Sequence, residues 1–204
     1  MKHFRDVYGE DISVDDVFYY IYGILHSEDY RERYANNLAK ALPRIPRVET
    51  RGEFNAFSLA GRRLADLHVN FEDVKEYDGV DFNRASRNYK VTQMKWGKIP
   101  GKTGNAGKDK TVLHYNKEIV IRNIPIEAQE YVVNKKSALD WIVDRVRVKT
   151  DKASGIENDF NDYAKEIGKP RYPLSLVLKV ITVSLETMKI VKSLPPLTIH
   201  PLDR

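Results

Sequence analysis

Apolar residues between positions 14 and 38 recur every three or four residues, which is the period of a helix that buries one face. Ser13 stands directly before this stretch, where its hydroxyl can accept a hydrogen bond from the first helical turn. We therefore expect a helix over these residues, kinked near His26–Ser27. It ends ahead of Pro43, because proline cannot continue a helix.

The middle of the chain changes from helical to strand-like spacing. Phe54–Leu67 fits a second helix, and His68–Phe71 fits a short strand that precedes an acidic, turn-rich stretch. Side chains from Tyr89 to Trp96 alternate between two faces, which is the period of a strand. Two further strands are expected at Thr111–Tyr115 and Glu118–Ile121, joined by a hairpin turn.

The segment Gly97–Lys110 has a composition of its own. It holds four glycines and one proline, and it has almost no apolar side chain. Because such a segment cannot offset the entropy of ordering by burying apolar surface, we expect a long mobile loop.

The last third of the chain is mainly helical. Pro125 begins a short helix, and Ser137 with Asp140 forms a capping-box pattern ahead of an apolar run. Trp141 follows this pattern on the apolar stripe, so we expect it in the core. Residues 149–168 are polar and predict loops with one short helix. Pro173 suits the first turn of a final helix, which ends before the next pair of prolines.

These elements predict an α+β fold with N-terminal helices, a small central antiparallel sheet that carries a long basic loop, and C-terminal helices. We expect one domain made of a helical scaffold part (1–68), a small β-sheet part (69–124) and a helical C-terminal part (125–204). No apolar run reaches the roughly 18 residues of a membrane span, and no apolar signal segment follows the N-terminus. The chain also has no cysteine, so we expect a cytoplasmic protein with no membrane partner and no thiolate metal site.

Positive charge gathers in one segment of the chain. Nine basic residues against one acid between Arg84 and Lys117 give this segment +8, whereas the whole chain carries +5, which leaves −3 for the rest. Such segregation is expected of a surface that faces nucleic-acid phosphates, although a solvated basic face has the same composition. Trp96 beside it could stack on a base, but packing in the sheet is the favoured interpretation.

We predict that the basic side chains of this segment contact the backbone of a nucleic acid, DNA or RNA, and that two amide side chains read base edges. The predicted backbone contacts are Arg84, Arg87, Lys90, Lys95, Lys98, Lys102, Lys108 and Lys110. The predicted base readers are Gln93 and Asn105.

Motifs for catalysis are not found in the sequence. A Walker A loop needs four residues between its glycines and a Ser or Thr after the lysine, whereas five residues separate Gly101 from Gly107 and Asp109 replaces the hydroxyl. The five histidines are scattered and have no cysteine partners, so no zinc site is predicted. The acids from Asp66 to Asp78 could form a nuclease metal site, but acids in a turn-rich stretch are more often solvated.

Two sets of residues resemble a known family, occur in the family's order and together cover nearly the whole chain. The first looks like a segment that follows the methyltransferase core in restriction–modification proteins with a fused adenine methyltransferase: Val17–Ser27, Tyr30–Ala35 and Leu42–Pro46. The second is similar to the C-terminal specificity domain of type ISP restriction–modification enzymes: Leu113–Lys117, Ile124–Pro125, Ala128–Tyr131, Ser137–Trp141, Asp144–Arg145, Thr150–Ile156 and Asn158–Asp159.

The resemblance implies a role for this chain within a larger polypeptide. Such enzymes join a nuclease, a helicase-like ATPase often described as DEAD/DEAH-box, a coupler, an adenine methyltransferase and a target recognition domain. This chain would be the last of these, or its C-terminal half, and not an enzyme by itself. ATP, magnesium and S-adenosylmethionine would then serve the parent, and no cofactor would bind here. Its implied partners are double-stranded DNA and the methyltransferase and coupler domains. The alternative is a structural docking module, in which the basic loop faces solvent and Tyr19 and Tyr22 lie on the docking face.

Overall fold

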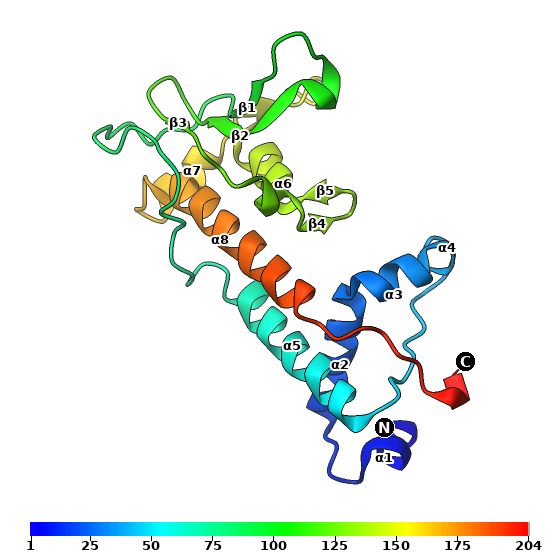
Figure 1. Cartoon of the computed structure of the whole chain (residues 1–204). Helices are drawn as coiled ribbons and strands as arrows, with labels where there is room; N and C mark the ends of the chain where they lie inside the picture. Colours follow the sequence, from blue (N-terminus) through cyan, green and yellow to red (C-terminus); the bar gives the residue numbers. More distant parts are fainter. Residues whose placement is uncertain (204) are drawn as a thin grey trace. The chain divides into compact units, whose positions relative to one another are not determined.

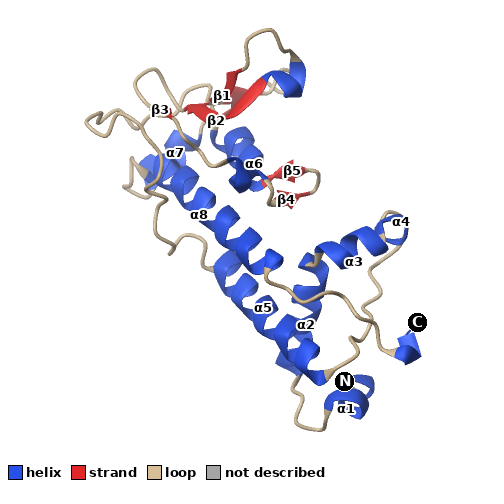
Figure 2. Cartoon of the chain, viewed as in Figure 1, coloured by secondary structure: helices blue, strands red, loops and turns tan. Residues whose placement is uncertain are grey.

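The computed structural model describes residues 1–203, and its α+β fold with helices toward both ends confirms the predicted class (Figures 1 and 2). The chain divides into two compact units, each with a hydrophobic core. Unit 1 comprises residues 1–70 and the tail from Lys189, and unit 2 comprises Phe71–Met188. The expected boundary at residue 125 does not divide the chain, because the sheet and the helices that follow it share the core of unit 2.

Unit 1 is built from helices. They are α1 (Lys2–Tyr8), α2 (Val14–His26), α3 (Glu28–Arg33), α4 (Ala35–Leu38), α5 (Arg51–Val69) and the short 3-10 turn η3 (Pro201–Asp203). Ser13 caps α2 and Thr50 caps α5, each in a capping box with the acid three residues later. The helix predicted to run on to Leu38 stops at His26, because Ser27 accepts a hydrogen bond from the Tyr30 N–H and so begins α3.

Helices α2 and α5 pack at very close range. A Cβ atom at Gly61 would lie 1.8 Å from the carbonyl oxygen of Tyr19, and one at Gly23 would lie 2.3 Å from that of Phe57. Only glycine at both positions allows the two backbones to approach so closely. The apolar faces predicted from the helical period therefore meet across a contact that the period alone does not reveal.

Three buried tyrosines hold residues 44–48, which we call the tyrosine-held segment. Their hydroxyls donate to the carbonyls of alternate residues: Tyr30 to Arg44 (2.8 Å), Tyr20 to Pro46 (2.6 Å) and Tyr8 to Val48 (2.6 Å). Burial raises the pKa of Tyr8 and of Tyr20, so both hydroxyls stay protonated and can donate. The C-terminal tail also binds this segment, since the His200 N–H donates to the Arg47 carbonyl at 2.8 Å.

Unit 2 contains all the strands of the described chain. Its elements are β1 (Lys95–Lys98), η1 (Gly104–Gly107), β2 (Lys108–His114), β3 (Val120–Ile121), η2 (Ile126–Gln129), β4 (Val132–Val133), β5 (Lys136–Ser137), α6 (Ala138–Val146), β6 (Lys149–Thr150), β7 (Glu157–Asn158), α7 (Phe160–Glu166) and α8 (Tyr172–Lys192), whose last turn belongs to unit 1. The main sheet is antiparallel with the order β1-β2-β3, while β4–β5 and β6–β7 are separate hairpins. Residues 1–203 contain no helix with the length and sustained hydropathy of a membrane span.

The strand predicted at His68–Phe71 is wrong, because His68 and Val69 form the last turn of α5. Val69 favours strands as a β-branched residue, but its side chain is 77% exposed and does not pack in a sheet. The helix ends at Asn70, whose backbone N–H and side-chain amide both bind Asp66, at 2.9 and 2.8 Å.

The strand predicted at Tyr89–Trp96 is wrong over most of its length, since only its last two residues belong to β1. Val91 is buried, and its backbone N–H and carbonyl pair with the side-chain amide of Asn161 at 2.8 and 3.0 Å. The amide of Asn116 binds two more carbonyls of the same stretch. Asparagine side chains therefore satisfy the backbone groups that a neighbouring strand would otherwise bind.

Candidate nucleic-acid interface

The glycine-rich segment forms a hairpin instead of the long mobile loop that its composition predicts. Strands β1 and β2 pair as far as Lys98 and Lys108, which leaves only the residues between them as a connection. Within it the Ile99 N–H donates to the Gly107 carbonyl at 2.8 Å. A Cβ atom at Gly107 would lie 2.5 Å from the Lys102 carbonyl oxygen. Backbone hydrogen bonds and a glycine contact therefore shape this loop without an apolar core of its own.

Residues of the β1–β2 hairpin, the turn between β4 and β5, and α6 line a hollow of about 740 Å³, which we call the basic hollow. Eight basic side chains line it against two acidic ones, Asp140 and Asp144. The basic side chains are Lys95, Lys98, Lys102, Lys108, Lys110, Lys135, Lys136 and Arg147. This excess of positive charge in a concave surface suits a polyanion.

Two smaller hollows meet the basic hollow at residues 92–95. The second hollow, of about 610 Å³, is lined in part by Lys90, and the third, of about 300 Å³, in part by His114. Lys95 lines all three hollows, and Gln93 lines the second and the third. Both side chains are exposed, so residues 92–95 present polar groups where three concave surfaces join.

The eight cations of the basic hollow fall into two groups of four. In the first group, Arg147 pairs with Asp144 at 3.3 Å and the Lys95 ammonium donates to the Gln93 side chain at 2.6 Å. Lys110 and Lys136 form ion pairs with Asp140 and Asp144 of α6, and these pairs connect two hairpins to the helix. The second group has no hydrogen-bond or ion-pair partner for its ammonium groups within residues 1–203, and it comprises Lys98, Lys102, Lys108 and Lys135. The first group therefore fixes the walls of the hollow, and the second is available to an anion.

Asp140 joins the sheet to α6. The indole N–H of Trp96 donates to its Oδ1 at 2.8 Å, and Lys110 binds the same oxygen. The predicted capping box is therefore half formed: the Ser137 hydroxyl accepts from the Asp140 N–H, but the carboxylate turns toward the sheet. Burial alone would raise the pKa of Asp140, but the hydrogen bonds from Lys110 and Trp96 outweigh it and hold the pKa below its usual value. The carboxylate is therefore ionised at neutral pH and neutralises Lys110.

Comparison with known proteins identifies the family. The family model of the Type ISP C-terminal specificity domain matches residues 1–176. The chain belongs to this family. A comparison with curated proteins gives no match.

Three solved structures resemble this specificity domain. A nuclease-deletion mutant of the Type ISP restriction-modification enzyme LlaGI, in complex with a DNA substrate mimic, is 43% identical with a TM-score of 0.79, over 93% of this chain and 17% of that one. The ATP-dependent Type ISP restriction-modification enzyme LlaBIII bound to DNA is 39% identical with a TM-score of 0.80, and the match covers 94% of this chain and 12% of that one. A DrdV–DNA complex is 31% identical with a TM-score of 0.75, and the match covers 97% of this chain and 20% of that one. The specificity domain therefore spans no more than a fifth of the length of these relatives.

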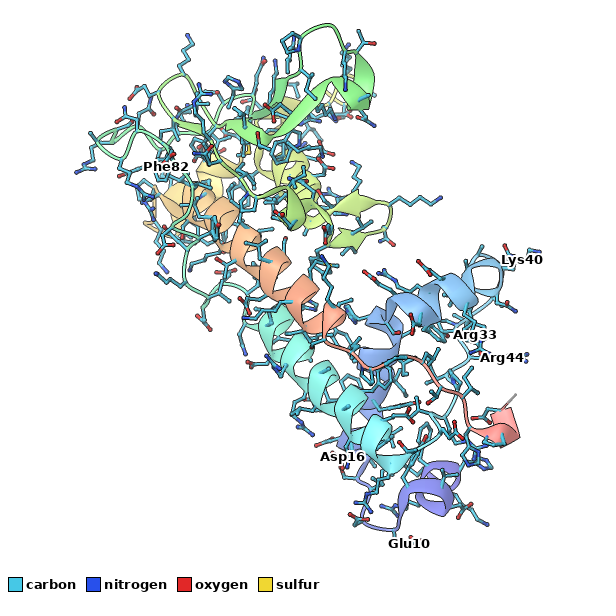
Figure 3. All side chains as sticks on the ribbon, viewed as in Figure 1. Glu10, Asp16, Arg33, Lys40, Arg44 and Phe82 are labelled. Atoms are coloured by element: carbon cyan, nitrogen blue, oxygen red, sulfur yellow. The ribbon has the colours of Figure 1, made fainter. Side chains whose placement is uncertain are left out.

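Most of the predicted contact residues line the hollows of the specificity domain. Six of the ten line the basic hollow: Lys95, Lys98, Lys102, Asn105, Lys108 and Lys110. Lys90 and Gln93 line the second hollow. Of the three hollows, none is lined by Arg84 or Arg87. Arg84 instead donates to the Val80 carbonyl at 3.2 Å and lies 4.5 Å from the ring centre of Phe82, which Figure 3 labels.

Three basic residues of the hollow were missed by the sequence analysis. Lys135 and Lys136 follow a pair of valines and Asn134, a pattern of strand and turn residues that predicts a short hairpin. Arg147 follows α6 directly and lines both the basic and the second hollow. Their distance in sequence from the basic segment conceals them, because the folding of α6 against the sheet brings them together.

Only one of the two tryptophans packs as predicted. Trp96 is 8% exposed and its indole N–H is bound, which confirms the packing interpretation. Trp141 was expected in the core but is only half-buried; its indole N–H donates to the Val133 carbonyl at 2.8 Å, and Lys136 lies 4.9 Å from its ring centre. Trp141 therefore fixes the β4–β5 hairpin onto α6.

The acids between Asp66 and Asp78 do not form a metal site. Glu76 binds Arg171 through both carboxylate oxygens, and Asp78 pairs with Lys75 at 2.7 Å. Within residues 1–203, no three histidine, aspartate or glutamate side chains gather as metal ligands.

Proposed function

We propose that this chain is the sequence-specific duplex DNA target recognition domain of a single-polypeptide type ISP restriction–modification enzyme. It would position DNA for the parent's adenine methyltransferase and its helicase–nuclease. The observation that carries the proposal is the basic hollow, in which four unpaired lysines face an open concave surface of about 740 Å³. The DNA-bound state of the LlaGI, LlaBIII and DrdV structures supports duplex DNA as the ligand.

In this proposal the two kinds of polar side chain have separate tasks. The ammonium groups of Lys98, Lys102 and Lys108 bind phosphates, which sets the register of the domain but does not read sequence. Gln93 stands where the hollows meet, and its Oε1 accepts a hydrogen bond from Lys95 at 2.6 Å. Its amide N–H groups are then held outward as donors for base edges.

The chemistry of restriction and methylation would belong to other parts of the parent. We propose that ATP, magnesium and S-adenosylmethionine bind there, and that this chain acts on DNA without catalysis of its own. Its short span of 12% to 20% of the DNA-bound relatives leaves ample chain for those domains.

The test is a titration of labelled duplex DNA with the 204-residue chain, followed by fluorescence anisotropy at several salt concentrations. A random duplex pool measures backbone binding, and repeated selection from that pool yields a preferred sequence. The affinity falls as salt rises, so the slope of log affinity against log salt is negative. The triple variant Lys98→Ala, Lys102→Ala, Lys108→Ala is expected to make this slope shallower by about 3, since each phosphate contact contributes about 0.9.

The matched control removes three exposed cations of unit 1: Arg33→Ala, Lys40→Ala and Arg44→Ala. These side chains extend from α3, from the turn after α4 and from the tyrosine-held segment (Figure 3). The control carries the same change of charge and is expected to keep the wild-type slope. Equal slopes for the two triple variants, or salt-independent binding by the wild-type chain, would overturn the proposed function.

A docking role for unit 1 is the second candidate, and a different surface favours it. Phe18 and Val69 are 59% and 77% exposed, and with Tyr19 and Tyr22 they line a hollow of about 640 Å³ on α2 and α5. An apolar hollow of this kind is typical of a surface that another domain covers. The partner we propose is the methyltransferase and coupler part of the parent polypeptide.

This role is tested by measuring the binding of the chain to that part of the parent, expressed as a separate protein. The double variant Phe18→Ser, Val69→Ser is expected to weaken association by about tenfold or more. Leu59→Ser is the control, since Leu59 is 61% exposed on α5 but is not among the residues that line this hollow. Equal weakening by the control would show that the hollow is not the docking surface.

A further inference from the structure

The turn between β4 and β5 has an unusual backbone. Val133 pairs with Lys136, so Asn134 and Lys135 form the whole two-residue turn. Both have positive φ angles, 49° and 67°, which is the geometry of a type I′ turn. Asparagine tolerates this region, whereas the second position of such turns strongly favours glycine, because a side chain there is strained.

No contact within residues 1–203 explains a lysine at this strained position. The Lys135 side chain is exposed, and its ammonium has no hydrogen-bond or ion-pair partner within residues 1–203. Outliers of this kind persist where the side chain serves a purpose outside the fold. The position of Lys135 indicates that purpose, because it lines the basic hollow together with Lys98, Lys102 and Lys108 of the other hairpin.

The neighbouring residues fix this turn onto α6. Lys136 is paired with Asp144 and lies over the Trp141 ring, and the Trp141 N–H binds the Val133 carbonyl at 2.8 Å. The two adjacent lysines therefore differ: Lys136 holds the hairpin in place, and Lys135 is presented at the wall of the hollow. Because the backbone of the turn is already fixed, binding of an anion by Lys135 restricts only the lysine side chain.

We propose that the Asn134–Lys135 turn is a second DNA-gripping element of the specificity domain, in which Lys135 binds a backbone phosphate across the basic hollow from the β1–β2 hairpin. This inference rests on the proposed function. It assigns the contact to a residue outside the basic segment of the sequence, and it explains why this turn carries lysine where glycine would be more stable.

The inference predicts that affinity and stability change in opposite directions in one variant. Lys135→Gly removes the ammonium and relieves the strain, because asparagine followed by glycine is the pair that this turn favours. We expect a melting temperature about 2 °C higher. Duplex affinity should fall about three- to tenfold near 0.1 M salt, and the slope of log affinity against log salt should become shallower by about 1.

Two further variants complete the test. Lys135→Arg keeps the charge and is expected to keep the wild-type slope. Lys165→Ala removes an exposed charge from α7, outside the residues that line the three hollows, and is expected to change neither slope nor melting temperature. An unchanged slope in Lys135→Gly, while the wild-type chain binds with a clear salt dependence, overturns this inference alone. Salt-independent binding by the wild-type chain overturns the proposed function and this inference together.

Discussion

Unit 1 and unit 2 each hold a stretch of backbone with side chains instead of a neighbouring strand, but they differ in the polar groups that they leave unpaired. In unit 1, the hydroxyls of Tyr8, Tyr20 and Tyr30 are buried and each donates to a carbonyl of the tyrosine-held segment. In unit 2, two asparagine amides hold the backbone around Val91, while four lysines of the basic hollow have no partner within residues 1–203. Polar groups that stabilise a fold are those whose partners lie inside it, and polar groups that bind a ligand are those whose partners do not.

The largest expected effect lies in unit 1. Gly61→Ala adds a methyl carbon that would lie 1.8 Å from the Tyr19 carbonyl oxygen. Because this distance is far below a van der Waals contact, α2 and α5 must separate. We expect a loss of about 3 kcal/mol, which corresponds to a melting temperature lower by about 6–12 °C. Thermal unfolding followed by circular dichroism measures this shift. Gly101→Ala is the control, because a Cβ there has no atom within 4 Å, although its positive φ of 75° makes a small loss of stability expected.

The next effect compares buried and exposed polar groups directly. Tyr20→Phe removes a hydroxyl that donates to the Pro46 carbonyl and accepts from the Val48 N–H, so both backbone groups lose a partner in a buried site. We expect a loss of about 2 kcal/mol in urea unfolding. The triple variant of Lys98, Lys102 and Lys108 should change stability by no more than about 0.5 kcal/mol while it alters DNA binding. A destabilised lysine variant would remove the distinction between the two units.

The last effect concerns pH and again separates the units. Burial lowers the pKa of His68 to about 4, and nearby His26 contributes, while its Nδ1 lies 2.8 Å from the Tyr22 hydroxyl. An unfolded histidine titrates near pH 6.5, so between about pH 6.5 and 4 the unfolded chain binds a proton that the folded chain does not. Stability therefore falls as the pH drops from about 6.5 to 4, and below about pH 4 the protonation of His68 causes no further loss.

Urea unfolding at pH 7.5 and pH 5 measures this dependence. His68→Gln is expected to lose less stability between the two pH values than the wild-type chain does. His114→Gln, which changes an exposed histidine on β2 of unit 2, should leave the difference as it is in the wild type. An equal pH dependence in wild type and His68→Gln would show that His68 is not the group responsible.

Local rules in the sequence predict the elements better than they predict the site. The caps at Ser13 and Ser137 mark true helix starts, because a cap is a contact between residues close in sequence. The alternation at Tyr89–Trp96 places Val91 and Met94 on opposite faces, but both are buried. It also cannot show that Asn161, seventy positions later, supplies the hydrogen bonds of a strand. Periodicity over this stretch therefore reports neither the buried face nor the hydrogen-bond partner.

The candidate site was predictable to the extent that it is local in sequence. Lys95, Lys98, Lys102 and Lys108 all lie in the basic segment between Arg84 and Lys117, whose charge excess is visible without a structure. Lys135 and Arg147 reach the same hollow only because α6 packs against the sheet through Asp140 and its partners. The division of lysines into paired and unpaired groups also depends on those contacts, so no pattern of charges along the chain could give it.

The order of the two units along the chain has a consequence for how a family of such proteins can change. The chain leaves unit 1 once, after residue 70, and returns once, at Lys189. Every residue that lines the three hollows lies between these two points. One uninterrupted stretch of coding sequence therefore holds the whole proposed recognition surface. A single recombination event across that stretch would exchange one target for another and leave the tyrosine-held frame of unit 1 as it is.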